Sequence, residues 1–372
     1  MIYHKVGLNR YRYILIHKLK HSRLKTLYSF YKGFGVFLLL SIFNIQMNAQ
    51  DIHFSQFGNA PINLSPALTG IFGGDVRFVG NYRSQWNPSV SYLTFSGAAD
   101  MKFDKFCSNN NQWAGGLIFN YDQAGDSKLS TTQLALNSSY TQRVNNNNFM
   151  TLGIQLSGYQ RAFKIEDLEW GSQFGDRTFD PSIASGESFT NQSIAYGDFS
   201  VGLNWHFQKP NSQSSWNNQN RTKFDLGIGL FHINQPNKSF YDDEMETLPM
   251  RFAIYGLGTF RLVDPLDLVL VGMYQGHGPH QQIVVGLGGK IHLINELTSQ
   301  LNILFGVNFR LGDAIIPNVE VGYNSWKFGL SYDWNTSGFN EVTNGIGGIE
   351  LSAVYIFVKP QVEVYKNCNP IY

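Results

Sequence analysis

Cysteine and charge are both scarce in this sequence. Cys107 and Cys368 are its two cysteines among 372 residues, too few for a disulfide scaffold or a structural zinc cluster. Charged residues make up 15% of the chain, against about 25% in an average globular protein. Aromatic residues also reach 15%, and there are 37 glycines. This composition argues against an ordinary soluble α/β enzyme.

Acidic residues are missing from the first 49 positions, which carry eight lysines and arginines. The remaining chain holds 20 cations and 27 acids, a net charge of −7. Domains that bind nucleic acid show the opposite excess, because they must neutralise phosphates. The sequence therefore predicts no nucleic-acid partner.

An apolar run long enough for a membrane helix is also lacking. The longest run, residues 33–45, is shorter than the roughly 20 residues that span a bilayer. It follows the basic stretch and precedes the small residue Ala49, an order typical of a signal peptide. We predict that residues 1–49 are a cleaved signal peptide; an N-terminal membrane anchor is the alternative.

From residue 75 onward, apolar and polar residues alternate with a period of two, which predicts β-strands. Phe199, Val201, Leu203 and Trp205, for example, are separated by small or polar residues. A soluble β-sandwich also alternates. Three features favour a membrane barrel instead: long strands, aromatic residues near strand ends, and a second face rich in Gly, Asn, Gln, Ser and Thr.

The alternation predicts an all-β fold, a transmembrane antiparallel β-barrel of about 14 strands within residues 75–357. The even number is typical of single-chain bacterial barrels and predicts that the N- and C-termini lie on one side, which we assign to the periplasm. The expected strands are 75–83, 90–103, 113–122, 129–143, 149–163, 194–208, 222–233, 250–263, 266–277, 280–294, 301–312, 315–324, 326–335 and 345–357.

The connections of such a barrel would differ between its two sides. The longest ones, 164–193 and 234–249, face outward in this reading, as does 336–344. Most inner turns are short, but the polar stretch 209–221 is an exception. Residues 358–372 would form a periplasmic C-terminal tail.

Residues 50–74 do not alternate and contain two prolines and four glycines, so they are not a strand. Their large apolar residues would be unfavourable in water by roughly 1.5–3 kcal/mol each. We therefore expect this segment to fold into or beneath the periplasmic mouth of the barrel as a plug; a solvated periplasmic arm is the alternative. The apolar residues are Phe54, Phe57, Leu64, Leu68 and Phe72.

Two motifs give the chain a resemblance to a known family. Residues 50–70 read QDIHFSQFGNAPINLSPALTG and residues 81–88 read NYRSQWNP. Together they resemble the PorP/SprF family of type IX secretion membrane proteins of Bacteroidetes, with Ser65 where that family usually has Asn. Weaker similarity continues through Gln173-Phe174, Ala314–Pro317, Tyr332-Asp333 and Gly347–Leu351.

The resemblance implies an outer-membrane barrel needed for export or surface attachment of cargo with a C-terminal sorting domain, including gliding adhesins. It implies three kinds of partner: surface proteins of this kind, periplasmic components of the secretion machine, and outer-membrane lipid. A porin-like channel or small-solute transporter is the alternative function. The motif residues that become candidates for partner binding are Asp51, His53, Phe54, Ser55, Gln56, Phe57, Pro66, Ala67, Leu68, Gly70, Tyr82, Arg83, Gln85 and Trp86.

Signals for catalysis or cofactor binding are weak. His277 and His280 flank a turn but lack nearby carboxylates or thiols that would complete a metal site, so we read them as a solvated loop tip. Residues 286–290 lack the Gly-Lys-Ser/Thr end of a phosphate loop and lie inside an expected strand. The acidic clusters at 166–169 and 242–246 do not have the spacing of an EF-hand. We therefore predict a protein that is not an enzyme and has neither cofactor nor metal.

Overall fold

The computed structural model describes residues 51–85, 92–108, 111–125, 127–164, 168–175, 178–186, 191–209, 221–241, 245–296, 299–338 and 346–359, without the side chains of 104–108 and 346. The expected signal peptide, Trp86, the Cys107 side chain, Cys368, residues 242–244, and most of the stretches 209–221, 336–344 and 358–372 lie outside these residues. None of the helices in the described part of the chain is long and apolar enough to span a membrane.

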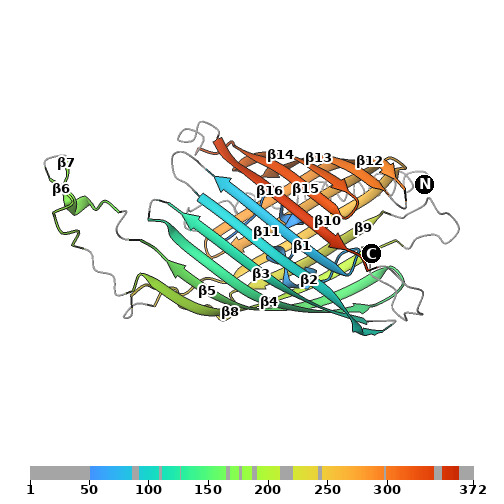
Figure 1. The fold of residues 1–372 in the computed structure, drawn as a ribbon, viewed down its shortest axis with the longest axis horizontal. Coiled ribbons are helices and arrows are strands. Elements are labelled where there is room, and N and C mark those ends of the chain that lie inside the picture. The colour runs from blue at the N-terminus through green and yellow to red at the C-terminus, as the bar shows by residue number, and fades with distance from the viewer. Residues whose placement is uncertain are drawn as a thin grey trace, which may run out of the picture. The chain divides into compact units, whose positions relative to one another are not determined.

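Fourteen antiparallel strands form a closed barrel (Figure 1). Each strand pairs with its neighbour along the chain, and β1 closes the barrel against β16, from Val76 opposite Phe357 to Gln85 opposite Gly348. The strands are β1 Val76–Gln85, β2 Tyr92–Ser108, β3 Asn111–Ala124, β4 Leu129–Arg143, β5 Asn148–Ala162, β8 Ser193–Gln208, β9 Lys223–Phe231, β10 Arg251–Val263, β11 Leu266–His277, β12 His280–Asn295, β13 Gln300–Arg310, β14 Ala314–Tyr323, β15 Trp326–Asn335 and β16 Ile346–Phe357. The predicted all-β barrel and its number of strands are thus confirmed.

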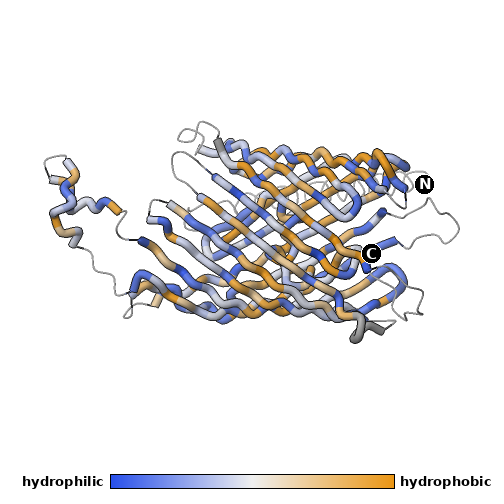
Figure 2. The backbone as a smooth tube through the Cα atoms, in the orientation of Figure 1, coloured by the Kyte–Doolittle hydropathy of each residue, from blue (hydrophilic) through white to orange (hydrophobic). Residues whose placement is uncertain are grey.

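The alternation of the sequence becomes an outer and an inner face. Apolar side chains that alternate along the strands, such as Leu134 and Leu136 of β4, are about 60% exposed on the outside. Their neighbours Ala135 and Asn137 are buried inside. Figure 2 shows the same alternation of hydrophobic and hydrophilic residues along the barrel strands. An apolar outer surface of this extent suits contact with lipid rather than water.

The two ends of the barrel differ in their connections. The end at which β1 starts and β16 finishes has the short connections 144–147, 264–265 and 324–325, together with the longer connection between β8 and β9; we call it the turn end. The opposite end, which we call the loop end, carries the longest connections, 163–192 and 232–250. The first of these contains the short helix η3 (Gly171–Gln173) and the hairpin of β6 (Phe174–Gly175) and β7 (Thr178–Phe179).

Aromatic rings gather on the barrel near the turn end. The Trp113 ring lies 4.9 Å from that of Tyr140, and the Trp326 ring lies 4.6 Å from that of Tyr355. Trp113 and Trp326 are more than 40% exposed, so these pairs sit on the outer surface. Amphipathic aromatic rings on the outer surface near one end of the strands are typical of the interfacial girdle of a membrane barrel.

Residues 51–74, which precede β1, lie inside the barrel and contain no strand. They form three short helices, η1 (Phe57–Asn59), α2 (Pro61–Leu64) and η2 (Pro66–Leu68), with prolines at the first positions of α2 and η2. Proline suits that position because its missing N–H would have no partner there. The five apolar side chains selected from the sequence, Phe54, Phe57, Leu64, Leu68 and Phe72, are at most 7% exposed. We call residues 51–74 the luminal segment.

Candidate functional site: a segment held inside the lumen

The luminal segment packs on two parts of the barrel wall through its apolar side chains. Phe57, Leu64 and Leu68 form one cluster with residues of β10, β11 and β12, among them Tyr255 and Met273. Ile62 forms a second cluster with Ile118 of β3 and Ala135 of β4. Because these contacts lie on different sides of the lumen, the segment bridges the barrel instead of lying along one wall.

A row of glycines receives the middle of the luminal segment. Gly153 of β5 lies opposite Gly202 of β8, which lies opposite Gly229 of β9. A Cβ atom on Gly153 would lie 2.3 Å from the backbone of Pro66 and Ala67, and one on Gly202 would lie 2.3 Å from Ser65 Oγ. The missing side chains therefore let the segment's backbone rest directly on the wall.

Gly153→Ala should weaken this seat. Its Cβ atom would meet backbone that cannot move aside cheaply, so we expect a loss of about 1–3 kcal/mol in the free energy of unfolding. Gly158→Ala is the matched control, since it lies on the same strand and its Cβ would meet no atom within 4 Å. Denaturant unfolding in detergent measures both, and equal midpoints for the two variants would contradict the proposed seat.

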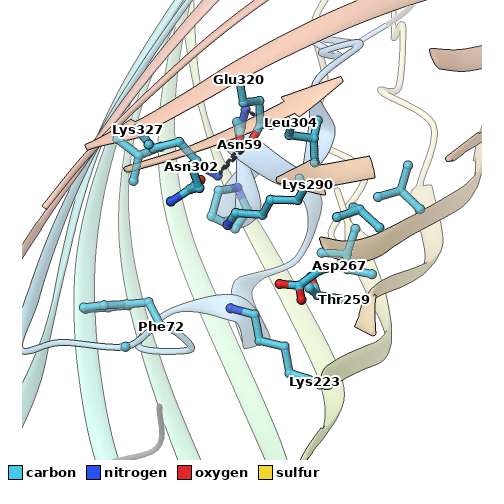
Figure 3. A pocket seen from close by; sticks show the side chains of 18 of the residues that line it. Asn59, Phe72, Lys223, Thr259, Asp267, Lys290, Asn302, Leu304, Glu320 and Lys327 are labelled. Atoms are coloured by element: carbon cyan, nitrogen blue, oxygen red, sulfur yellow. Dashed lines mark hydrogen bonds and ion pairs between the residues drawn. The ribbon is translucent and has the colours of Figure 1, made fainter. Parts of the chain in front are cut away.

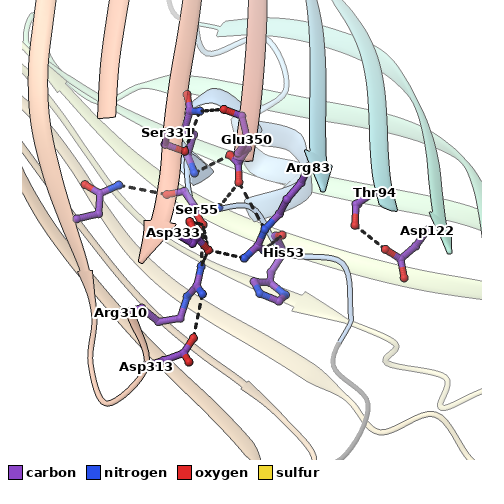
Figure 4. A network of polar contacts seen from close by, with 12 residues as sticks. His53, Ser55, Arg83, Thr94, Asp122, Arg310, Asp313, Ser331, Asp333 and Glu350 are labelled. Atoms are coloured by element: carbon purple, nitrogen blue, oxygen red, sulfur yellow. Dashed lines mark hydrogen bonds and ion pairs between the residues drawn. The ribbon is translucent and has the colours of Figure 1, made fainter. Parts of the chain in front are cut away.

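A buried polar network holds the first turns of the segment near the loop end. Asp333 of β15 accepts hydrogen bonds from the Ser55 hydroxyl at 2.7 Å, from Arg83 of β1 at 2.7 Å and from Arg310 of β13 at 2.9 Å. Arg83 also donates to the His53 carbonyl at 2.7 Å. Figure 4 shows these groups converging from separate strands onto Ser55.

Glu350 of β16 supplies the second acceptor of this network. Its two carboxylate oxygens accept the backbone N–H groups of Ser55 and Gln56 at 2.7 and 2.8 Å. The Gln56 side chain in turn donates to the Glu350 carbonyl and to Ser331 Oγ. Arg83, Asp333 and Glu350 are at most 2% exposed, so each charge depends on the others for compensation.

The start of the segment is held by a third group of charges at the loop end. The Asp51 carboxylate lies 3.1 Å from Arg251 Nε and 3.2 Å from His232 Nε2. His232 Nδ1 faces the Asp198 carboxylate at 3.2 Å. Burial alone would raise the pKa of Asp51, but Arg251 and His232 lower it below its ordinary value. Burial would lower the pKa of His232, but the neighbouring carboxylates of Asp198 and Asp51 raise it.

These shifts predict how stability depends on pH. The raised His232 pKa stabilises the fold below the ordinary histidine pKa of about 6.5, and this contribution is lost as the pH rises through the raised value. The lowered Asp51 pKa stabilises the fold above the ordinary carboxyl pKa of about 3.9, and this contribution is lost as the pH falls through the lowered value. The contact is therefore strongest between about pH 4 and pH 6.5.

His232→Asn tests this dependence. His232 has a φ of 58°, a left-handed conformation that Asn tolerates better than most residues. We expect the unfolding midpoint of the unaltered chain to fall between about pH 6 and pH 9 more steeply than that of the variant. Denaturant titrations at several pH values measure the difference, and parallel pH profiles would count against the assignment.

The last residues of the segment are held by charges nearer the turn end. Asp100 of β2 pairs with Arg77 of β1 at 2.7 Å and accepts the Gly70 N–H at 2.8 Å. Arg77 also donates to the Leu68 carbonyl at 3.0 Å. Gly70 has a φ of 79° and lies against Ala114, so both its conformation and its space favour glycine.

Between the segment and the turn end the lumen contains a cavity of about 1140 Å³, which we call the vestibule. Phe57 and Phe72 of the luminal segment form part of its lining. Its walls come mainly from β9–β15 and carry Lys223, Lys290 and Lys327 together with Asp225, Asp267 and Glu320. Figure 3 shows Lys223 and Lys290 extending into this space.

Most of the motif residues selected from the sequence meet inside the barrel. Asp51, His53, Ser55, Gln56 and Arg83 belong to the polar contacts described above. Phe54 is buried, Phe57 and Leu68 pack against the wall, and Pro66, Ala67 and Gly70 lie where the segment touches it. Two of them differ: Tyr82 is 40% exposed on the outer face, and Gln85 ends β1 half-buried. Trp86 lies outside the described residues.

The segment also reaches further than the sequence indicates. A plug at the mouth next to the start of β1 would lie at the turn end, whereas Asp51 contacts the first residue of β10 and the residue after β9, both at the loop end. The backbone N–H of Lys359, by contrast, donates to the Asp75 carboxylate at the turn end. The described chain thus begins near one end of the barrel and leaves it at the other.

The prediction that His277 and His280 form a solvated loop tip is wrong. They end β11 and begin β12, and they are only 8% and 9% exposed. The His277 ring lies 5.8 Å from that of His232, which contacts Asp51. Among the described residues there is no group of three or more His, Cys, Asp or Glu side chains placed to hold a metal ion.

The charged residues of the barrel wall that hold the luminal segment could not be identified from the sequence. Asp333 and Glu350 lie in segments that carry the family resemblance, but nothing in the sequence pairs them with Ser55. Arg77, Asp100 and Arg310 are charged residues at inward positions of alternating strands, and this placement is the available signal. The short acidic clusters contribute one described ion pair, between Glu246 and Lys238 at 2.9 Å.

Comparison with known proteins shows that the chain matches one protein family. The family described as "Type IX secretion system membrane protein PorP/SprF" matches residues 46–355. No curated protein matches the chain. Solved structures that are similar to it include the toluene transporter TbuX of Ralstonia pickettii, with 10% identity, 80% of this chain and 92% of that chain covered, and a TM-score of 0.45.

A FadL homologue of Pseudomonas aeruginosa is similar at 11% identity, covering 79% of this chain and 93% of that chain with a TM-score of 0.44. The translocator domain of the autotransporter NalP from Neisseria meningitidis is similar at 10% identity, covering 81% and 94% with a TM-score of 0.30. The family match, in contrast, extends over most of the chain and includes both the luminal segment and nearly all of the barrel. The chain belongs to the PorP/SprF family of type IX secretion system membrane proteins.

Proposed function

We propose that this barrel serves the type IX secretion system as a closed platform in the outer membrane, needed for export or surface attachment of cargo with a C-terminal sorting domain. Membership of the family supports the link to secretion. The observation that carries the platform role is the luminal segment, whose contacts with strands on several sides occupy the part of the lumen toward the loop end. An open diffusion pore would leave this part of the lumen filled with water.

In the same proposal, the turn end faces the periplasm and the loop end faces the cell surface. The start of β1 and the end of β16 share the turn end, and the longest connections lie at the loop end. Outer-membrane barrels combine short periplasmic turns with longer outer loops. The cleavage after Ala49, the periplasmic tail, the periplasmic partners and a role in gliding belong to this proposal too.

Affinity purification tests the function. The tagged full chain is extracted from the outer membrane in detergent, and its partners are identified by mass spectrometry against an untagged strain. Recovery of a surface protein with a C-terminal sorting domain is the expected result. Recovery of the barrel alone, together with steady ion conductance in a planar bilayer, would contradict the proposal and favour a porin-like channel.

A further inference from the structure

The charges of the vestibule are unbalanced in a chain whose expected mature form is acidic overall. Five lysine and arginine residues line the cavity, against three carboxylates. From this imbalance we propose that the vestibule binds a carboxylate-bearing polypeptide segment of a periplasmic partner, anchored by Lys223 and Lys290. The proposal deepens the platform function and rests on it, because it requires the turn end to face the periplasm.

The carboxylates of the vestibule wall are already engaged by other groups. These carboxylates still attract the two proposed anchors, but from beyond ion-pair distance: Asp225 attracts Lys223, and Asp267 and Glu320 attract Lys290. Asp267 lies 2.9 Å from Arg221 and 2.7 Å from His292. Asp225 lies 2.9 Å from His206. Glu320 lies 3.8 Å from Lys327 and accepts a hydrogen bond from the Asn59 amide at 2.8 Å.

Lys223 and Lys290, in contrast, form no ion pair with a carboxylate in the described part of the chain. They extend from β9 and β12 into the same space (Figure 3). Their ammonium groups repel each other, and Lys290 is repelled by Lys327 as well. An anion placed between them would remove this repulsion, and inside a low-dielectric wall such an interaction is stronger than in bulk water.

The size and lining of the vestibule favour a polypeptide over a small anion. Its volume of about 1140 Å³ exceeds the 300–1,000 Å³ or so of ordinary small-molecule pockets. The amides of Gln300, Asn302 and Asn318 line it and can bond to a peptide backbone, and the inward-facing Val269 and Val271 offer apolar contacts. Because the luminal segment lies across the lumen on one side, a partner would enter from the turn end.

A binding measurement on the full chain in detergent tests the proposal. The probe is a short fluorescent poly-glutamate peptide, compared with poly-glutamine of equal length by fluorescence polarisation. We expect the glutamate peptide to bind at least about tenfold more tightly, and to bind less tightly as ionic strength rises. The double variant K223Q/K290Q should lose about tenfold or more in affinity.

K164Q/K238Q is the matched control, because it removes the same charge from residues of the loop end and should bind like the unaltered chain. Heat-dependent migration in gels verifies that each variant is a folded barrel. The proposal is overturned if the unaltered chain does not prefer poly-glutamate, if K223Q/K290Q binds as tightly, or if inorganic phosphate displaces the peptide at equal charge concentration. These failures would leave cargo recovery intact, whereas loss of cargo recovery with intact peptide binding would reject the platform function alone.

Discussion

Deletion of residues 52–72 is expected to turn a closed barrel into an open pore. The segment fills the lumen near the loop end, while the wall is held by its own ladder of antiparallel strands, including the β1–β16 closure. After deletion the inward charges of Arg83, Asp333 and Glu350 would face water and lose their burial penalty. We therefore expect a folded barrel with at least a tenfold higher conductance in planar bilayers, by analogy with wide barrels that leave an aqueous channel.

Deletion of residues 171–186 is the control for this experiment. It removes the β6–β7 hairpin, which lies in a connection of the loop end and not among the contacts of the luminal segment. The control should remain as closed as the unaltered chain. If deleting 52–72 left the barrel folded and closed, the luminal segment would not be what blocks the lumen.

Asp333→Ala is expected to cause the largest loss of stability among single substitutions. Asp333 is the common acceptor for Arg83, Arg310 and Ser55, and its removal leaves two guanidinium groups buried with their main partner gone. Breaking a buried ion pair from one side costs about 3–5 kcal/mol. Denaturant unfolding followed by tryptophan fluorescence measures the change.

Two further variants separate charge from general disruption. Asp333→Asn keeps an acceptor for Ser55 but removes the charge, so its loss should be intermediate. Asp313→Ala breaks a pair with Arg310 in which the Asp313 side chain is 43% exposed, and such pairs contribute up to about 1 kcal/mol. Equal losses for Asp333→Ala and Asp313→Ala would refute the central role of the buried acceptor.

Much of the fold could be predicted from the sequence because a membrane barrel repeats one local rule. Each strand alternates in hydropathy, each connection interrupts the alternation, and neighbouring strands pair in chain order. The expected bounds 129–143, 266–277 and 326–335 coincide with β4, β11 and β15. Burial of the apolar residues of the luminal segment follows from the same solvent argument.

The path of the luminal segment could not be predicted, because it depends on contacts between distant residues. Ser55 meets Glu350 and Asp333 across nearly the whole length of the chain. The glycine row exists only once the register places Gly153, Gly202 and Gly229 side by side. In the sequence each is a single glycine in a separate strand.

The most direct test of this account is whether the luminal segment lies inside the barrel in the living outer membrane. Ala67 is fully buried against Gly153, whereas Ser172 lies in an exposed stretch of the longest loop. Single cysteines at these positions, in a Cys107→Ser/Cys368→Ser background, would be treated with a membrane-impermeant maleimide on intact cells and on permeabilised cells. We expect Ser172→Cys to be labelled, and Ala67→Cys to be labelled only after denaturation. Labelling of Ala67→Cys in folded protein from either side of the membrane would contradict it.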